Sequence, residues 1–554
     1  MKRIHSLLNS IYAKINHYSP VLVCSVLFLV SLFFLSLTPN NNSSNGDLAM
    51  FLNGQMRVVQ GGTPYKDFWT PYGALESYFP AFIFRNFGQT INAVYYTNIL
   101  ISALVVLFAF ILARQVTKNN MLSIMASLLV LFNGLYWRTF YYIHIYILFL
   151  LIATILFFKY TALNRKYLLL LAGLFTGFAF LFKIELAGAY GLALFFGVLV
   201  NNALNGKKIN DSAKDLLGIG IGFVASLTIL ILFNPEVAPY LYKEMVIDAL
   251  DSGTSMNLPY FHSIGSYAEI LFDKLALLNN SSSIFNFFQA GFFFIYFLNV
   301  ALNYFLPFIV LPLAVIFLKK LNLDKNTNLC YFFFIFWTIA TFPKSLGRSA
   351  ASQLSHALMP LFFVLIMTIN NLRKDYIPFK NREVLEKIII YTTAISLILS
   401  SVIVVSSSVN TLSKPSYEIK TQHGTLLTDE KSVADETNKI IELVYNYTNG
   451  PEDYIFVSTQ EAPPIYTLTN RKNPTYYSSM FDVIIRPSIE KQNKMCNDLI
   501  TKKTKIIIHD AYWGYDDLPE RQFLFAARTL HECIIANFKF LGNYGRYQVY
   551  ITYD

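Results

Sequence analysis

Long apolar segments alternate with short polar ones from the amino terminus to about residue 407. An α-helix needs about 20 apolar residues to cross the hydrocarbon core of a bilayer. The pattern therefore predicts a polytopic α-helical membrane protein with about eleven transmembrane helices. The span at 287–318 is long and contains Pro307 and Pro312, which predicts either a tilted, kinked helix or an interfacial helix followed by a span. The predicted spans lie at residues 18–38, 92–116, 120–136, 142–160, 167–182, 186–204, 215–233, 287–318, 329–343, 355–370 and 387–407.

A polar linker follows the last predicted span, with serines at 406–408 and a Lys414-Pro415 turn. The chain is therefore divided into a membrane domain at residues 1–407, with large outer loops at 39–90 and 235–287, and an external domain at residues 408–554. Helix and strand patterns alternate in the external domain, which predicts a small α/β fold. It has no Gly-rich phosphate loop and no nucleophile elbow, so we assign it no chemistry of its own. Its predicted helices lie at 429–449, 463–469 and 518–536, and its predicted strands lie at 454–458, 505–509 and 547–551.

Composition agrees with a membrane protein, because 54% of the residues are hydrophobic, 14% are charged and the mean hydropathy is +0.43. The formal net charge of +10 is spread over short loops without a basic run, which argues against nucleic acid as a partner. Lys and Arg are more frequent in the loops on the side of the amino terminus, so the positive-inside rule places that terminus in the cytoplasm. An odd number of spans then places the external domain in the periplasm or an equivalent compartment, with the chain in the inner membrane.

Two of the four cysteines, Cys496 and Cys533, fall in the external domain. An extracytoplasmic compartment is oxidising, so a disulfide between them is chemically allowed. The sequence leaves their pairing open, because it does not give the distance between the two Cα atoms.

The first outer loop carries two candidate carboxylates. Asp47 precedes apolar residues at helical spacing, which predicts an interfacial helix with Asp47 at its amino end. Such an acid either caps the helix or faces the headgroup level of the outer leaflet. Asp67 follows in the stretch Tyr65-Lys66-Asp67-Phe68-Trp69, where it either has a chemical role or pairs with Lys66 while the aromatic rings anchor at the membrane interface.

The order of Asp47, Gly61-Gly62 and Tyr65-Lys66-Asp67-Phe68 resembles the polyprenyl-phosphate-sugar-dependent glycosyltransferases of the GT-C class. That family is related to protein mannosyltransferases and to the aminoarabinose transferases of lipid A. The stretch from Gly177 to Lys183 and the segment from Pro464 to Pro474 are also similar to the family pattern, and the resemblance covers nearly the whole chain in layout. Leu48 departs from the pattern, because a second carboxylate would stand there, so a paired-acid or metal-binding arrangement is unsupported at this point.

The resemblance implies sugar transfer from a polyprenyl phosphate, which needs a base for the acceptor hydroxyl and positive charge for the departing phosphate. Asp47 is the candidate base and Asp67 the next candidate. Lys183 and Arg348 are candidates for binding the phosphate, since an arginine fork and a desolvated lysine both suit that anion. The alternatives are a Lys183 paired with Glu185 and an Arg348 that is a solvated loop cation.

His356 and Arg138 are weaker candidates for contacts with the donor phosphate, because both flank predicted spans. A satisfied histidine at a helix end is the alternative for His356. No cofactor and no metal is predicted, and a divalent ion is unsupported by any ligand pattern.

The expected function is that of a membrane glycosyltransferase of the cell envelope, which acts at the outer face of the inner membrane. Its partners would be a polyprenyl-phosphate sugar, membrane lipid, and an acceptor that is a glycan, a lipid or a protein. One alternative is an oligosaccharide ligase or oligosaccharyltransferase that uses a polyprenyl diphosphate. The other is a lipid-sugar transporter or flippase without catalysis. Ionisable groups strung through the middle of the bilayer would favour transport, whereas groups gathered at the outer interface favour transfer.

Overall fold

The computed structural model describes residues 14–37, 46–88, 90–134, 142–243, 247, 260–280, 284–320, 323–347, 351–372, 382–459, 464–477, 479–514 and 518–553. A helix lies at the position of each of the eleven predicted spans. The number of these helices that cross a bilayer stays a prediction. The helices are α2 (Pro20–Ser36), α5 (Ile91–Thr117), α6 (Asn120–Gly134), α7 (Tyr142–Leu163), α8 (Tyr167–Phe180), α9 (Ile184–Leu204), α10 (Ile209–Phe233), α14 (Ile284–Lys320), α15 (Lys325–Gly347), α16 (Ala351–Leu372) and α17 (Arg382–Ser413).

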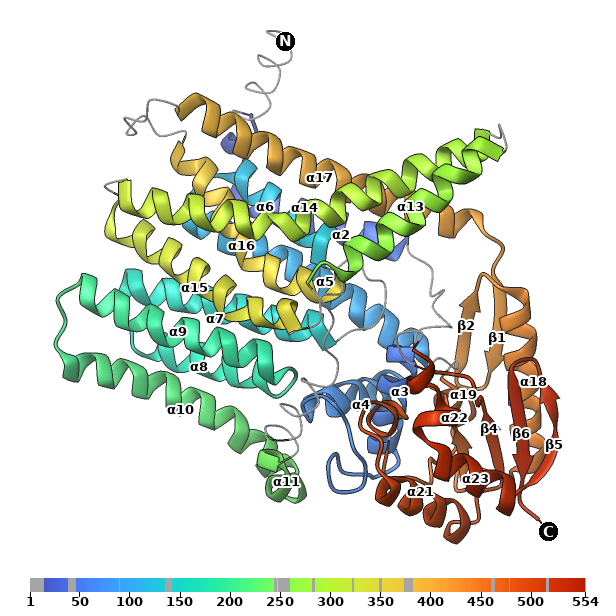
Figure 1. Cartoon of the computed structure of the whole chain (residues 1–554). Coiled ribbons are helices and arrows are strands. Elements are labelled where there is room, and N and C mark those ends of the chain that lie inside the picture. The colour runs from blue at the N-terminus through green and yellow to red at the C-terminus, as the bar shows by residue number, and fades with distance from the viewer. Residues whose placement is uncertain are drawn as a thin grey trace.

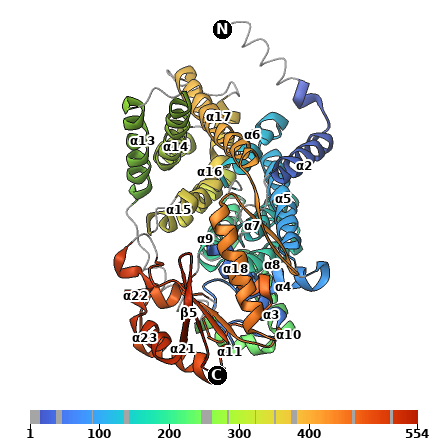
Figure 2. The ribbon, with the colours of Figure 1, turned by 90° about the vertical axis from the view of Figure 1, so that its right-hand side faces the viewer.

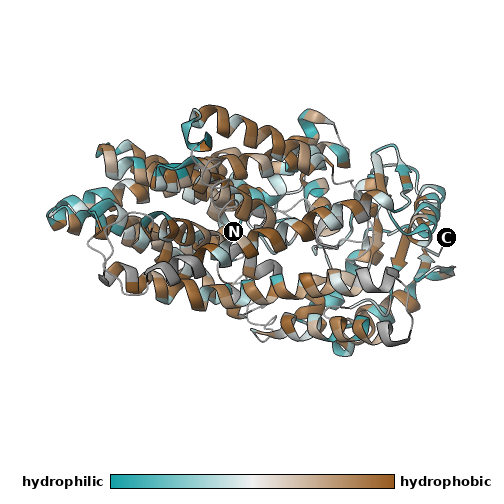
Figure 3. Cartoon of the chain, turned by 90° about the horizontal axis from the view of Figure 1, so that it is seen from above, coloured by the Kyte–Doolittle hydropathy of each residue, from teal (hydrophilic) through white to brown (hydrophobic). Residues whose placement is uncertain are grey.

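Six helices of the described chain are long and apolar enough to cross a membrane, which makes this a helical membrane protein. They fall within α5, α7, α9, α10, α14 and α17, and four shorter apolar helices fall within α2, α6, α8 and α16. Pro307 and Pro312 both lie inside α14, which runs as one helix of 37 residues. The bundle is predominantly apolar in Figure 3, and polar residues are more frequent toward helix ends.

Small residues allow α8 and α10 to pack closely. A β-carbon on Gly177 would stand 1.9 Å from the hydroxyl oxygen of Ser226, and one on Gly222 would stand 1.9 Å from the carbonyl oxygen of Leu170. Close backbone approach of this kind is how helices associate in lipid, where no hydrophobic force drives them together. The two helices thereby form a rigid wall for the cavity described below.

The C-terminal domain, described from residue 417 to residue 553, is an α/β fold at one end of the helical bundle, and α3 and α4 lie between the two (Figure 1, Figure 2). Its main sheet has the strand order β3-β4-β6-β5, in which β3 and β4 are parallel and the other neighbours are antiparallel. A separate hairpin joins β1 to β2. The strands are β1 (Tyr417–Thr421), β2 (Gly424–Thr428), β3 (Ile455–Val457), β4 (Ile506–His509), β5 (Lys539–Tyr544) and β6 (Tyr547–Ile551).

Alternating side chains of the main sheet enter two hydrophobic clusters, because successive residues of a strand point to opposite faces. Ile506 and Ile508 of β4 pack with residues of α18 (Lys431–Tyr447) and α19 (Ile465–Thr469). Ile507 between them packs with residues of α21 (Ile489–Thr501), α22 (Phe523–Ala526) and α23 (Arg528–Asn537). The domain is therefore a three-layer sandwich, and a disulfide between Cys496 and Cys533 joins α21 to α23.

Several further elements complete the described chain. Two of them, α3 and α4, are central to the site described next. These elements are α3 (Gly46–Val59), α4 (Leu75–Phe87), η1 (Pro235–Val237), α11 (Ala238–Tyr242), α13 (His262–Asn280), α20 (Phe481–Ile485) and η3 (Pro519–Arg521).

Candidate functional site

The loop at residues 60–74 joins α3 to α4, and its fold is fixed by local hydrogen bonds. The carboxylate of Asp67 accepts from the backbone N–H of Thr63 at 2.8 Å, and the backbone N–H of Asp67 donates to the carbonyl of Thr63 at 2.9 Å. Lys66 does not pair with Asp67, because its ammonium lies 2.8 Å from the carboxylate of Glu236. Asp67 is thus an exposed acid that closes a turn of the loop.

Aromatic residues of this loop are buried in protein instead of anchoring at a membrane interface. Phe68 is completely buried, and Trp69 is 5% exposed within the cluster formed by α21 and α23. The predicted interfacial helix is α3, and its apolar residues Phe51, Leu52 and Met56 are likewise buried in the protein core. The loop and α3 therefore form part of the contact between the helical bundle and the C-terminal domain, to which α5 and β2 also contribute.

Two lysines converge on one carboxylate where α9 begins. Lys183 directly precedes α9 and is buried, and its Nζ lies 3.2 Å from Oε1 of Glu185. Lys344, in the last turn of α15, donates to the same oxygen at 2.9 Å. The buried carboxylate of Glu76 also acts electrostatically on Lys183. The two ammonium groups of this lysine pair therefore lie among carboxylates, and what they offer an anion is charged hydrogen-bond donors.

The lysine pair also contacts the 60–74 loop. The ring of Tyr72 lies 4.4 Å from Nζ of Lys183, within the range of a cation–π interaction. Burial lowers the pKa of Lys183, and the neighbouring Glu185 carboxylate opposes that shift. The sequence-based candidate Lys183 and its alternative partner Glu185 are therefore in direct contact, and Lys344 and Tyr72 join them.

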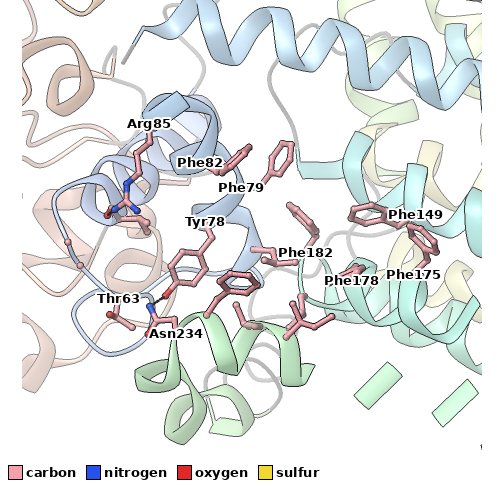
Figure 4. A pocket seen from close by; sticks show the side chains of 18 residues that line it. Thr63, Tyr78, Phe79, Phe82, Arg85, Phe149, Phe175, Phe178, Phe182 and Asn234 are labelled. Carbon is pink, nitrogen blue, oxygen red and sulfur yellow. Dashed lines mark hydrogen bonds between the residues drawn. The ribbon is translucent and has the colours of Figure 1, made fainter. Parts of the chain in front are cut away.

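A cavity of about 600 Å³ lies beside this cluster, between α4, α7, α8 and α10. Figure 4 shows a row of phenylalanines along it, with polar groups at the end formed by Thr63, Arg85 and Asn234. Asn234 donates to the hydroxyl of Tyr78, and Arg85 donates to the carbonyl of Val58 at 2.8 Å. The cavity is lined by Val58, Gly61, Gly62, Thr63, Leu75, Tyr78, Phe79, Phe82, Arg85, Phe149, Phe175, Phe178, Leu181, Phe182, Ile229, Leu230, Phe233 and Asn234.

One turn of chain links the apolar cavity to the lysine pair. Leu181 and Phe182 line the cavity, and Lys183 is the next residue. This turn is held by two backbone hydrogen bonds of 3.2 Å. The N–H of Gly73, in the 60–74 loop, donates to the carbonyl of Phe182. The N–H of Leu75, at the start of α4, donates to the carbonyl of Leu181. A long apolar group in the cavity would therefore lie next to the turn that ends at Lys183.

The structure tests only part of the predicted site. Asp47 lies in the first turn of α3 and His356 lies in α16, but their side chains are outside the part of the chain that is described. Arg138 and Arg348 are outside the described residues altogether. Within the described residues, no group of three or more His, Cys, Asp or Glu side chains is placed to hold a metal ion.

Lys344 was not among the sequence-based candidates. Its position four residues before Arg348, at the end of a predicted span, is the signal that indicates it. No protein-family model matches this chain, and no curated protein sequence matches it.

Proposed function

We propose that this chain is a membrane glycosyltransferase that moves a sugar from a polyprenyl-phosphate donor to a glycan, lipid or protein acceptor at the outer face of the membrane. The observation that carries the proposal is the turn at residues 181–183, in which Leu181 and Phe182 line an aromatic cavity and the next residue, the buried Lys183, shares Glu185 with Lys344. A polyprenyl phosphate has the same two parts, a long apolar tail and an anionic head. A phosphate also suits a site in which Lys183 and Lys344 supply charged hydrogen-bond donors.

The proposed reaction is a displacement at the anomeric carbon of the donor sugar. The acceptor oxygen forms a bond to that carbon, and the bond from the carbon to the phosphate oxygen breaks, so its electron pair leaves with the polyprenyl phosphate. A carboxylate takes the proton of the acceptor hydroxyl. Asp47 is the proposed base, with Asp67 as the second candidate, and the lysine pair stabilises the leaving phosphate.

The positions of ionisable residues favour transfer over transport. In the six candidate spans of the described chain, the acidic and basic residues lie in the outer thirds, as Glu185 does at the start of α9 and Arg114 does near the end of α5. A transport path needs polar sites near the midplane of the bilayer. Charge near the ends of spans instead places chemistry at a membrane surface.

The test is to incubate membranes that contain the protein with labelled polyprenyl-phosphate sugars and to identify what becomes labelled. We expect label to pass to a glycan, lipid or protein with wild-type membranes and not with membranes that lack the protein. A polyprenyl diphosphate donor that alone gives labelled product would support a ligase instead. Binding of the donor with no transfer under any condition would overturn the proposed activity.

A further inference from the structure

The C-terminal domain holds the 60–74 loop through two residues of that loop, Tyr65 and Trp69. The N–H of Trp69 donates to the carbonyl of Tyr476 at 2.8 Å, and its ring stacks on that of Phe481, with centroids 6.3 Å apart and planes 12° apart. The hydroxyl of Tyr476 donates to the carbonyl of Tyr65 at 2.8 Å. These contacts join residues more than 400 positions apart in the sequence.

Tyr65 has a backbone conformation that bulky residues rarely adopt. Its φ angle is +67°, in the left-handed region, and its side chain is 1% exposed. A conformation of this kind persists only where the surroundings determine it. Here the N–H of Tyr65 donates to the carbonyl of Phe68 at 2.7 Å, and its carbonyl accepts from Tyr476. The C-terminal domain therefore supplies part of what keeps Tyr65 in place.

The same tyrosine reaches toward the lysine pair. The hydroxyl of Tyr65 donates to the carbonyl of Tyr72, whose ring lies 4.4 Å from Nζ of Lys183. The next residue, Gly73, donates to the carbonyl of Phe182. A continuous series of direct contacts thus runs from Tyr476 through Tyr65 and Tyr72 to Lys183.

We propose that Tyr476 is a positioning residue for the lysine pair: it holds Tyr65 in the left-handed conformation and so keeps the ring of Tyr72 against Lys183. The C-terminal domain, which has no assigned chemistry, is then a support that sets the position of a phosphate-binding lysine. The effect on donor use rests on the proposed function, whereas the effect on Lys183 itself does not.

The experiment compares Tyr476→Phe with wild type in the full-length protein in membranes. The variant keeps the ring and removes only the hydroxyl. Tyr445→Phe is the matched control, because the hydroxyl of Tyr445 also donates to a backbone carbonyl of the C-terminal domain, that of Leu468, at 3.3 Å. Lys183 is labelled with an amine-reactive reagent at fixed pH, and the rate is followed by peptide mass spectrometry.

We expect Tyr476→Phe to raise the labelling rate of Lys183 by about fivefold, the change that corresponds to the loss of one hydrogen bond. Tyr65→Phe, which removes the bond to Tyr72, should raise it similarly, and Tyr445→Phe should leave it unchanged. An unchanged rate in both test variants would overturn the proposal, as would an equal increase in the control. Tyr65→Phe also provides the test if Tyr476→Phe does not accumulate in membranes.

A second measurement separates this proposal from the proposed function. With a polyprenyl-phosphate sugar that supports transfer, Tyr476→Phe should raise the donor KM by about fivefold and leave the acceptor KM unchanged. If the hydroxyl of Tyr476 only stabilised the fold, Tyr476→Phe would lower kcat without a selective change in the donor KM. That outcome would overturn the positioning role. If the labelling rate changes as expected while wild-type membranes transfer no sugar, the proposed function fails and the link from Tyr476 to Lys183 stands.

Discussion

Gly73 lies directly against the carbonyl oxygen of Leu181, which is 1.9 Å from the place where a β-carbon on Gly73 would stand. Any other residue must therefore push the 60–74 loop away from the turn that ends at Lys183. Glycine is required here for close approach of two backbones.

The first prediction follows from this contact. Gly73→Ala should separate Tyr72 from Lys183 and reduce kcat/KM for the polyprenyl-phosphate donor by about tenfold or more, the scale of an overpacked site. Gly188→Ala is the control, because a β-carbon on Gly188 of α9 would meet nothing within 4 Å. Transfer rates in membranes, normalised to protein abundance, provide the measurement. Equal rates for Gly73→Ala and wild type would contradict the prediction.

The second prediction concerns the lysine pair. Lys344→Ala and Lys183→Ala should each raise the donor KM by about tenfold or more, as expected for a lost hydrogen bond to a charged group, with little change in the acceptor KM. Lys66→Ala removes an exposed lysine of the 60–74 loop that pairs with Glu236, so it should leave both constants near wild type. An equal effect on donor and acceptor would argue against phosphate contacts.

The third prediction tests the proposed base. Asp47→Asn keeps the size of the side chain and removes its ability to take a proton, so it should abolish transfer without lowering the amount of protein in membranes. Asp67→Asn should reduce activity less, because its carboxylate accepts a hydrogen bond from Thr63 that an amide oxygen can also accept. Activity retained in Asp47→Asn and lost in Asp67→Asn would move the base to Asp67.

The fourth prediction concerns the aromatic cavity. Phe178→Trp places a larger ring in the cavity wall, so donors with long prenyl tails should lose about tenfold in kcat/KM and donors with short tails should lose less. Phe195→Trp is the control, because Phe195 is 42% exposed on α9 and does not line the cavity. The check is a comparison of donors with different tail lengths. A loss that is independent of tail length would indicate that the tail lies elsewhere.

The fifth prediction is a pH dependence of the C-terminal domain. Burial lowers the pKa of His509 to about 3, and His531 adds to the shift. An unfolded histidine titrates near 6.5, so between about pH 6.5 and 3 the unfolded state binds a proton that the folded state does not. This contribution to stability is therefore complete above pH 6.5 and falls by about 1.4 kcal/mol per pH unit as the pH decreases toward 3.

Hydrogen exchange of β4 and β6 in the full-length protein measures this dependence. The variant His509→Gln should show a smaller decrease in protection from pH 6.5 to 4.5 than wild type. Burial raises the pKa of Asp510, which gives a pH dependence of stability with the opposite sign to that of His509. Asp510 is present in both proteins, so its contribution cancels when wild type and variant are compared. Identical slopes for the two proteins would contradict the assignment to His509.

The helices of the membrane domain could be predicted from sequence because each depends on a local property, a run of apolar residues of sufficient length. The pattern also located β3, β4 and β6, which are buried runs of β-branched and aromatic residues. It was wrong for residues 518–536, predicted as one helix, where η3, α22 and α23 form separate short elements. It missed α21, although Ser488 accepts a hydrogen bond from the N–H of Lys491 as a helix cap does.

The arrangement of the site was less predictable, because its contacts join residues far apart in the chain. Lys344 and Glu185 are 159 residues apart, and no local pattern indicates that their side chains meet. The possible ion pair between Lys66 and Asp67 was wrong for the opposite reason. Neighbours in sequence point in different directions when one of them closes a turn, and Glu236 from η1, distant in the chain, pairs with Lys66 instead.

The burial of Trp69 beside α21 and α23 has a consequence for biosynthesis. The ribosome makes the 60–74 loop early and the helices that cover Trp69 near the end of the chain, so the loop cannot reach its final conformation during translation of the membrane helices. A nonsense mutation shortly before residue 476 would leave every span intact and still expose the indole ring, because its partners Tyr476, Tyr477 and Phe481 would be missing. Such a truncated product should be recognised by proteases that survey exposed aromatic surface, even though its insertion into the bilayer is complete.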